Sequence, residues 1–247
     1  MIYAYRTDKG VRPRNEDCCR IPEAGERPLV IVADGMGGHK SGDVASQSAV
    51  RLISSYASQA PVELGCVPML RQAIAYANRS IFESAQHDYD RMGMGTTVVV
   101  ALLEPTKYTA AHIGDSRLYH FKTETQRLSR VTRDHSYVQE LVTGGFITEE
   151  QAQRHPQRNI LTRAVGTSGF EKADVSTKSW HRGDRLLLCT DGLCGYVSDA
   201  HIESVMRRVR DPLACCDALT ELALSSGSAD NITVVIVENE GAAADGR

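Results

Sequence analysis

The sequence predicts an α+β fold in a single domain, with antiparallel strands and amphipathic helices. Its 247 residues suit one large domain, because a chain of this length buries a substantial core. Short runs rich in Val, Ile, Leu and Thr, bounded by Gly, Asp or Pro, are typical of strands. Three of these runs follow one another through short turns, which favours antiparallel pairing over strand–helix–strand crossovers. We find no internal repeat and no Pro-, Gly- or Ser-rich linker that would divide the chain.

The expected strands are short runs bounded by turn-forming residues. The consecutive antiparallel group is formed by the second, third and fourth of them. In chain order the strands are expected at residues 29–33, 96–103, 108–113, 117–121, 185–190 and 231–237.

The expected helices show 3.6-residue periodicity and recognisable end signals. Stripes of small and apolar side chains run along residues 44–56 and 68–81. The small early residues of the first stripe would let that helix lie close to a sheet. A third helix has Asp211 as its N-cap and Pro212 in its first turn, with Gly227 at its end.

Composition excludes several classes of protein and site. The net charge of -3 gives no electrostatic reason to expect nucleic acid or an anionic membrane as the main partner. The longest apolar run, residues 98–103, is far below the roughly 20 residues of a membrane helix, and the N-terminus has no signal-peptide pattern. The seven cysteines contain no C-x-x-C pair, so we expect buried, reduced thiols in a cytoplasmic protein rather than a zinc site.

Four aspartates occupy comparable positions, each at the end of an expected strand. Asp34, Asp115 and Asp191 follow strands, and Asp230 precedes one. Each has a small neighbour, which lets a backbone carbonyl or a ligand come close. Taken singly, Asp34 and Asp191 are best interpreted as turn residues whose carboxylates bond their own backbone.

If the four aspartates converge, their repulsion requires cations. Two carboxylates about 4 Å apart repel by roughly 4 kcal/mol at an effective dielectric constant near 20. An all-oxygen ligand set indicates Mg²⁺ or Mn²⁺ rather than zinc or copper. Two such ions lower the pKa of a bridging water, and a phosphoester is the natural substrate because the ions also neutralise its oxygens. Arg12 or Arg14 could clamp the phosphate, and spacing alone does not choose between them. The alternative is a solvated charge cluster, which is the preferred interpretation for Arg14.

The motifs in their order resemble the metal-dependent serine/threonine protein phosphatases of the 2C type, the PPM family, in its compact bacterial form. The likeness extends from about Gly10 to Val237. The segments that carry it are Arg12-Pro13-Arg14-Asn15-Glu16-Asp17, Val32-Ala33-Asp34-Gly35-Met36-Gly37-Gly38-His39, Gly95-Thr96-Thr97, His112-Ile113-Gly114-Asp115-Ser116-Arg117, Leu161-Thr162-Arg163-Ala164-Val165-Gly166, Cys189-Thr190-Asp191-Gly192 and Asp230-Asn231-Ile232-Thr233.

The resemblance implies a four-layer α-β-β-α sandwich, in which two antiparallel sheets lie between helix pairs. It implies that Asp34 bridges two metal ions and that Gly35 offers its carbonyl to one of them. Asp191 and Asp230 would hold the other ion, and Asp115 with Asp191 would form a third, weaker site.

The resemblance also assigns the groups around the ions. Glu16 and Asp17 match an acidic pair that orders metal-bound waters, and Arg12 matches the phosphate-binding arginine. Where eukaryotic members have a histidine proposed as general acid, this chain has Met36. His39 comes three residues later, and neither spacing nor resemblance gives it that role.

Residues 135–157 resemble the mobile flap beside the bacterial active site, although an ordinary helix–turn–helix insertion is the alternative. Thr148 and Gln151 form a capping box there, after the flexible pair Gly144-Gly145. We therefore expect one domain over residues 1–240, with a flap, and a disordered tail over residues 241–247.

The leading hypothesis is a monomeric cytoplasmic phosphatase that hydrolyses phosphoserine and phosphothreonine in proteins, using two Mn²⁺ or Mg²⁺ ions and in some states a third. Its partners would be phosphorylated proteins and a bacterial Ser/Thr kinase. Two alternatives remain: a catalytically silent regulator that binds phosphoproteins, and a two-metal hydrolase of nucleotides or other small phosphoesters.

Overall fold

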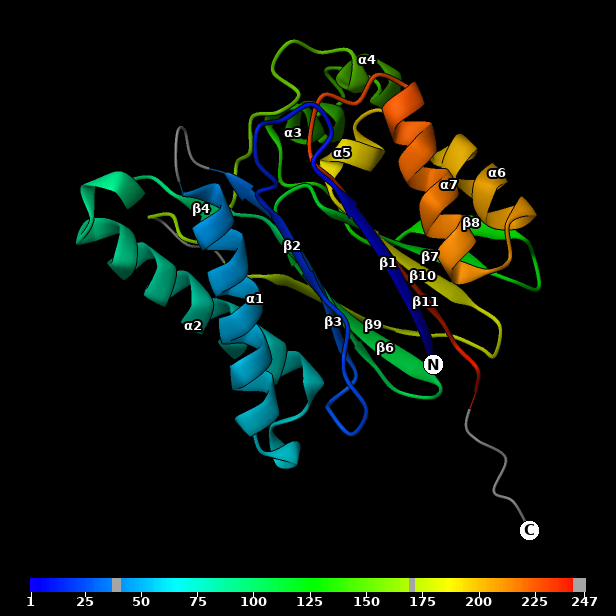
Figure 1. Cartoon of the computed structure of the whole chain (residues 1–247), viewed down its shortest axis with the longest axis horizontal. Coiled ribbons are helices and arrows are strands. Elements are labelled where there is room, and N and C mark those ends of the chain that lie inside the picture. The colour runs from blue at the N-terminus through cyan, green and yellow to red at the C-terminus, as the bar shows by residue number, and fades with distance from the viewer. Residues whose placement is uncertain (37–40, 169–171, 242–247) are drawn as a thin grey trace.

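The strands form two antiparallel sheets that pack face to face (Figure 1). The computed structural model describes residues 1–36, 41–168 and 172–241. The first sheet has the order β1-β11-β10-β7-β8, and the second has the order β2-β3-β5-β6-β9, with β4 beside β3. The strands are β1 (Ile2–Asp8), β2 (Asp17–Arg20), β3 (Leu29–Met36), β4 (Gly95–Thr96), β5 (Val98–Leu103), β6 (Lys107–Ile113), β7 (Arg117–Lys122), β8 (Arg127–Arg130), β9 (Asp174–Ser179), β10 (Arg185–Cys189) and β11 (Ile232–Glu238).

Two pairs of helices cover the outer faces of the sheets (Figure 1). One pair, α1 (Gly42–Gln59) and α2 (Cys66–Gln86), packs on the second sheet. The other pair consists of α6 (Asp199–Arg208), which packs beside β8, and α7 (Pro212–Ser225), which packs on β1 and β11. Shorter helices are η1 (Val62–Leu64), η2 (Tyr89–Arg91), α3 (Tyr137–Thr143), α4 (Glu149–Gln153) and α5 (Asp191–Cys194). The layers therefore follow the predicted α-β-β-α order.

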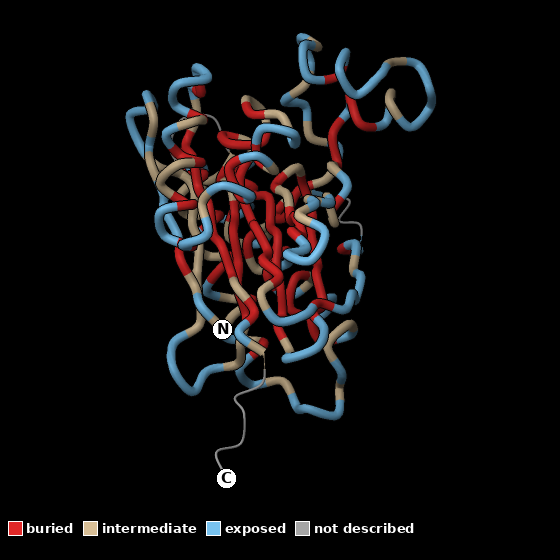
Figure 2. Tube along the Cα trace, turned by 90° about the vertical axis from the view of Figure 1, so that its right-hand side faces the viewer, coloured by how far each residue is buried: buried red, intermediate tan, exposed pale blue. Residues whose placement is uncertain are grey.

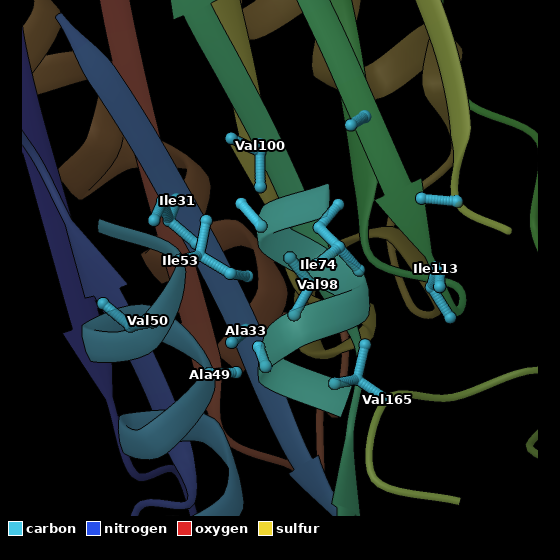
Figure 3. Close-up of a cluster of buried hydrophobic side chains, with 14 of the residues drawn as sticks. Ile31, Ala33, Ala49, Val50, Ile53, Ile74, Val98, Val100, Ile113 and Val165 are labelled. Carbon is cyan, nitrogen blue, oxygen red and sulfur yellow. The ribbon is translucent and has the colours of Figure 1, made fainter. Parts of the chain in front are cut away.

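The core has three layers of side chains, because both faces of the central strands are buried. In β3, Ile31 and Ala33 join the cluster under α1 and α2, which also contains Ile53 (Figure 3). Val30 and Val32, which alternate with them, face the cluster between the two sheets. A strand buried on both faces has a continuous apolar run instead of an alternating pattern. Figure 2 shows that the buried residues concentrate along these central strands.

The structure corrects several boundaries of the predicted elements. The run at residues 96–103 is divided at Thr97 into β4 and β5. Asp34 lies inside β3 rather than after it, and Thr190 is the N-cap of α5 rather than the end of a strand. Helix α2 begins at Cys66, ahead of the Pro68 predicted.

Four strands and one longer helix were not predicted: β1, β2, β8, β9 and α6. The strands lie at or near sheet edges and are partly exposed, so they lack a strong apolar pattern. The capping box at Thr148 and the N-cap at Asp211 are confirmed. The predicted tail lies outside the described residues apart from Gly241. Among the described helices, none combines the length and the apolar character that crossing a bilayer requires.

Candidate active site

The four strand-end aspartates converge on one cavity, as predicted. A cavity of about 640 Å³ opens at one end of the sandwich, and all four carboxylate residues line it. Glu16, Gly35, Arg12 and Arg14 also line this cavity. Asp17 is not among the residues that line the cavity. It lies on β2, directly opposite Asp34 in the pairing of β2 with β3. The structure therefore brings together every residue that the sequence singled out for the metal site.

Two threonines hold the backbone of Asp34. The Asp34 N–H donates to Thr97 Oγ1 at 3.0 Å. The Asp34 carbonyl accepts from the Thr97 N–H at 2.8 Å and from Thr96 Oγ1 at 2.8 Å. Thr97 Oγ1 also lies 2.7 Å from Ser116 Oγ, next to Asp115. One buried threonine thus connects the strand end of Asp34 with the turn that carries Asp115.

Glycine is required beside two of the aspartates because the backbone approaches closely. A Cβ atom at Gly35 would lie 2.1 Å from the Gly42 carbonyl oxygen, at the start of α1. A Cβ atom at Gly192 would lie 1.9 Å from the Asn231 carbonyl oxygen, so α5 rests directly against the beginning of β11. That contact places Asp191 beside Asp230, although the two come from different segments.

Burial raises the pKa values of Asp17, Asp34, Asp115 and Asp191, and repulsion from neighbouring carboxylates adds to the rise. For Asp34, burial is the main cause of a pKa well above the usual range, followed by the charges of Asp17 and Asp191. Burial likewise raises the pKa of Asp115 well above its usual range, and the charge of Asp191 adds to it. Burial raises the pKa of Asp17 to about 7, although hydrogen bonds from Thr233 and Thr190 oppose the rise. Without cations, Asp17 therefore takes up a proton as the pH falls through about 7.

Two buried oxygens in the cluster have no hydrogen-bond partner in the described structure: Asp17 Oδ1 and Asp191 Oδ1. A buried carboxylate oxygen left unpaired is costly unless a cation or a water is bound to it. The donors are carboxylates and a glycine carbonyl, which are the ligands that Mg²⁺ and Mn²⁺ prefer. The residues present thus match the two-ion site that the sequence predicts.

Arg12 lies at the rim of the cavity and is already paired with a member of the cluster. Its Nη2 lies 2.7 Å from Asp230 Oδ2, and its Nε donates to the Ala229 carbonyl at 3.1 Å. About half of its side chain is exposed, so it can meet a phosphate arriving from solvent. Arg14 also lines the cavity, but the contact at Asp230 belongs to Arg12.

Asn231 has a structural role at the site that the sequence did not reveal. Its Oδ1 accepts from the Glu16 N–H at 2.8 Å, while its Nδ2 donates to the carbonyls of Lys9 and Arg14 at 2.9 Å and 2.8 Å. The side chain therefore holds the segment that carries Arg12 and Glu16 against the strand end of Asp230. Thr190 acts similarly, because its Oγ1 donates to Asp17 Oδ2 at 2.9 Å.

Met36 stands where eukaryotic members have the histidine proposed as general acid. Met36 lines the cavity. His39, Gly37 and Gly38 lie outside the described residues.

A second cavity, of about 490 Å³, lies beside the first and is lined in part by residues of the predicted flap. The two cavities share Asp115, Asp191 and Asp230 in their walls. Helices α3 and α4 lie within residues 135–157, and Gly145, with a φ of 72°, lies between them. Residues 135–157 therefore lie beside the four aspartates and cover the second cavity, which adjoins the first.

Comparison with known proteins agrees with the geometry. The family model described as Protein phosphatase 2C matches residues 11–224. The chain belongs to the protein phosphatase 2C family. Its sequence is 40% identical over 243 residues to "Serine/threonine phosphatase stp" of Listeria innocua, covering 96% of both chains. It is 38% identical over 242 residues to "Serine/threonine protein phosphatase PstP" of Mycobacterium tuberculosis, covering 96% of this chain and 45% of that protein.

Solved structures of this 2C family share the fold over nearly the whole chain. Staphylococcus aureus Stp1 matches with a TM-score of 0.89 and 34% identity, covering 97% of this chain and 95% of the other. The catalytic domain of PstP in complex with two manganese ions matches with a TM-score of 0.84 and 35% identity, covering 96% and 97%. The predicted family and fold are therefore confirmed.

Proposed function

We propose that this member of the protein phosphatase 2C family hydrolyses phosphoserine and phosphothreonine in proteins, using Mn²⁺ or Mg²⁺. One observation supports the proposal above the others: four aspartates line one cavity, a fifth, Asp17, is paired with Asp34 behind it, and two buried oxygens of this group have no hydrogen-bond partner in the described structure. Hard divalent cations relieve this arrangement, and a phosphate monoester is the substrate whose charge such ions complement.

In this proposal the residues divide between two core ions and a weaker third one. Asp34 and the Gly35 carbonyl would hold one core ion, and Asp34 would also serve the other. Asp191 and Asp230 would hold the second core ion, and Asp115 with Asp191 would hold the third. Glu16 and Asp17 would orient the surrounding water. When bound, the ions supply an activated water and neutralise the oxygens of the transferred phosphate.

Arg12 is proposed as the phosphate-binding residue. In the structure its guanidinium is held by Asp230 Oδ2 at 2.7 Å. Once Asp230 serves as a ligand, its charge holds Arg12 less tightly, and the planar guanidinium can donate two hydrogen bonds to phosphate oxygens. Arg12 then orients the phosphate from the solvent side of the cavity.

The biological setting is also proposed. We infer that residues 1–240 act as one catalytic domain, in which residues 135–157 form a flap that influences the choice of substrate. The substrates are phosphorylated proteins, and we propose that the enzyme is a monomer that reverses the action of a Ser/Thr kinase. The seven cysteines are free thiols, which suits a reducing cytoplasm.

The test is hydrolysis of a phosphothreonine peptide by Asp34→Ala and Asp191→Ala. Both variants are expected to lose activity while keeping the fold, as measured by circular dichroism. Asp217→Ala is the matched control, because Asp217 is an exposed aspartate that pairs with Arg6 on the surface. EDTA should abolish turnover by the unsubstituted enzyme, and Mn²⁺ should restore it. Near-normal turnover by either site variant would contradict the proposal, as would faster hydrolysis of nucleotides than of phosphopeptides.

A further inference from the structure

His135 lies at the foot of the proposed flap and contacts the turn that carries Asp115. Its side chain is 8% exposed. The Gly114 N–H donates to His135 Nδ1 at 3.1 Å, and the His135 N–H donates to the Gly114 carbonyl at 3.0 Å. Gly114 directly precedes Asp115, and its φ is 103°. Two hydrogen bonds between the same pair of residues fix the orientation of this turn.

The hydrogen bonds also fix the protonation of the imidazole. Since Nδ1 accepts from the Gly114 N–H, it carries no proton. Nε2 lies 3.2 Å from Asp174 Oδ2. Asp174 is held in turn, because Arg163 Nη1 donates to its Oδ1 at 3.2 Å. The ring therefore stands in a chain of contacts that runs from Arg163 through Asp174 to Gly114.

A second histidine keeps the ring in place from one side. His112 and His135 stack with ring centroids 4.6 Å apart and an interplanar angle of 10°. Burial, with the neighbouring His112, lowers the pKa of His135 to about 4. The imidazole is thus neutral at physiological pH, as the bond from Gly114 requires.

The same three side chains could be considered as a metal site, because His112, His135 and Asp174 offer ligand atoms within 4.8 Å of one another. Two observations oppose this. Arg163 Nη1 lies 2.8 Å from His135 Nε2, where the ion would have to bind. Coordination through Nε2 would also move the ring proton to Nδ1 and break the bond from Gly114. These three side chains are therefore arranged for hydrogen bonding rather than for binding a metal ion.

The His135 backbone also closes the base of the flap. The Thr162 N–H donates to the His135 carbonyl at 2.9 Å. The Tyr137 N–H donates to the Ile160 carbonyl at 2.9 Å, and Ser136 forms a bridge with Leu161. The chain that follows the flap therefore returns, at residues 160–162, to the residue that holds the Asp115 turn.

We infer that His135 is a positioning residue, whose Nδ1 acceptor holds the Gly114–Asp115 turn so that Asp115 can serve the third divalent ion beside Asp191. The inference rests on the proposed function, because the role of Asp115 comes from there. Partners that orient a metal ligand in this way typically contribute about 10-fold to 100-fold in metal affinity.

Two substitutions at His135 distinguish the loss of the Nδ1 acceptor from the loss of the imidazole ring itself. His135→Asn places an amide oxygen near the position of Nδ1 and can still accept from Gly114. His135→Gln reaches toward Asp174 but leaves the Nδ1 position without an acceptor. Asp115→Asn is the reference variant, since it removes the charged ligand. His120→Asn is the matched control, because His120 is also buried and paired with an aspartate, Asp184, but lies near the opposite end of β10 from Asp191.

The measurement is a titration with Mn²⁺ in which free Mn²⁺ is followed by electron paramagnetic resonance. His135→Gln should weaken the weakest-bound ion about tenfold or more and leave the tighter ions unchanged. His135→Asn and His120→Asn should bind all ions as the unsubstituted protein does. Adding His135→Gln to Asp115→Asn should not lower the affinity for the weakest-bound ion any further, because the two substitutions act on the same ion site.

Other results would overturn the inference. These are normal binding of the third ion by His135→Gln, equal losses in the two His135 variants, or additive losses in the double variant. If His135→Gln does not fold, ¹⁵N NMR of the unsubstituted protein decides, because a proton on Nδ1 at pH 7 contradicts the geometry. Failure of the proposed function looks different: the unsubstituted protein would bind Mn²⁺ normally but would not hydrolyse phosphopeptides.

Discussion

Replacing Gly192 by alanine should separate Asp191 from Asp230. The added methyl group would lie 1.9 Å from the Asn231 carbonyl oxygen and 2.8 Å from its carbonyl carbon. Since non-bonded carbon contacts are normally about 3.5–4.0 Å, α5 and the start of β11 must move apart by roughly 1.5 Å. Both contacting atoms belong to the backbone, so no side chain can rotate to relieve the clash. The displacement therefore falls on the two aspartates that flank the contact.

The expected effects are a moderate loss of stability and a large loss of activity. Overpacking of this kind costs about 1–3 kcal/mol, and each kcal/mol lowers the Tm of a domain of this size by about 2–4 °C. A misplacement of about 1 Å at a catalytic site can cost about 100-fold in rate. We therefore expect kcat/KM on a phosphothreonine peptide to fall about 100-fold, with weaker Mn²⁺ binding, in a protein that remains folded.

Gly144→Ala is the control for Gly192→Ala. Gly144 has a helical φ of -72°, and the atoms nearest to its added Cβ are ring carbons of Phe146, which is 78% exposed and free to rotate. Its Tm and Mn²⁺ affinity should remain unchanged. If Gly192→Ala also kept its full activity and Mn²⁺ affinity, the contact at Asn231 would not set the spacing of the aspartates, and the reasoning would fail.

Three further predictions follow from the structure. The pKa of Asp17 is about 7 in the folded protein and near 3.8 in the unfolded chain, so protonation of Asp17 stabilises the metal-free fold, and this stabilisation is lost as the pH rises through 7. The increase in Tm caused by adding Mn²⁺ should therefore become larger between about pH 4 and pH 7. An increase in Tm that stays constant over this range would contradict the account. Arg12→Lys should raise KM for a phosphopeptide about 10-fold, since a lysine cannot donate two parallel hydrogen bonds, with little change in Tm; an unchanged KM would remove Arg12 from phosphate binding. Ile53→Ala should lower the free energy of unfolding in urea by about 2–5 kcal/mol because Ile53 is fully buried (Figure 3), whereas Val62→Ala, at an 81% exposed position, should not.

The sequence predicted the strands that are buried on both faces and the aspartates at their ends. Residues 29–33 and 186–189 form unbroken apolar runs, which is why the positions of Asp34 and Asp191 could be inferred. The family resemblance then predicted the convergence of Asp34, Asp115, Asp191 and Asp230, and the cavity confirms it. Their individual metal-binding roles stay predictions.

Edge strands and contacts between distant segments could not be predicted in the same way. Strand β9 is mostly exposed, and its hydrogen bonds to β6 decide its conformation rather than its own residue pattern. The pairing of Asp17 with Asp34 depends on the register of β2 against β3. The contact of His135 with Gly114 joins residues 21 positions apart, and nothing in the local sequence around either residue indicates it.

The central claim is that the strand-end carboxylates hold divalent ions. Anomalous diffraction at the manganese absorption edge, from crystals grown with Mn²⁺, tests it directly. We predict at least two anomalous peaks between Asp34, Asp191 and Asp230. Peaks only elsewhere, or none in a protein that hydrolyses phosphopeptides, would contradict the claim.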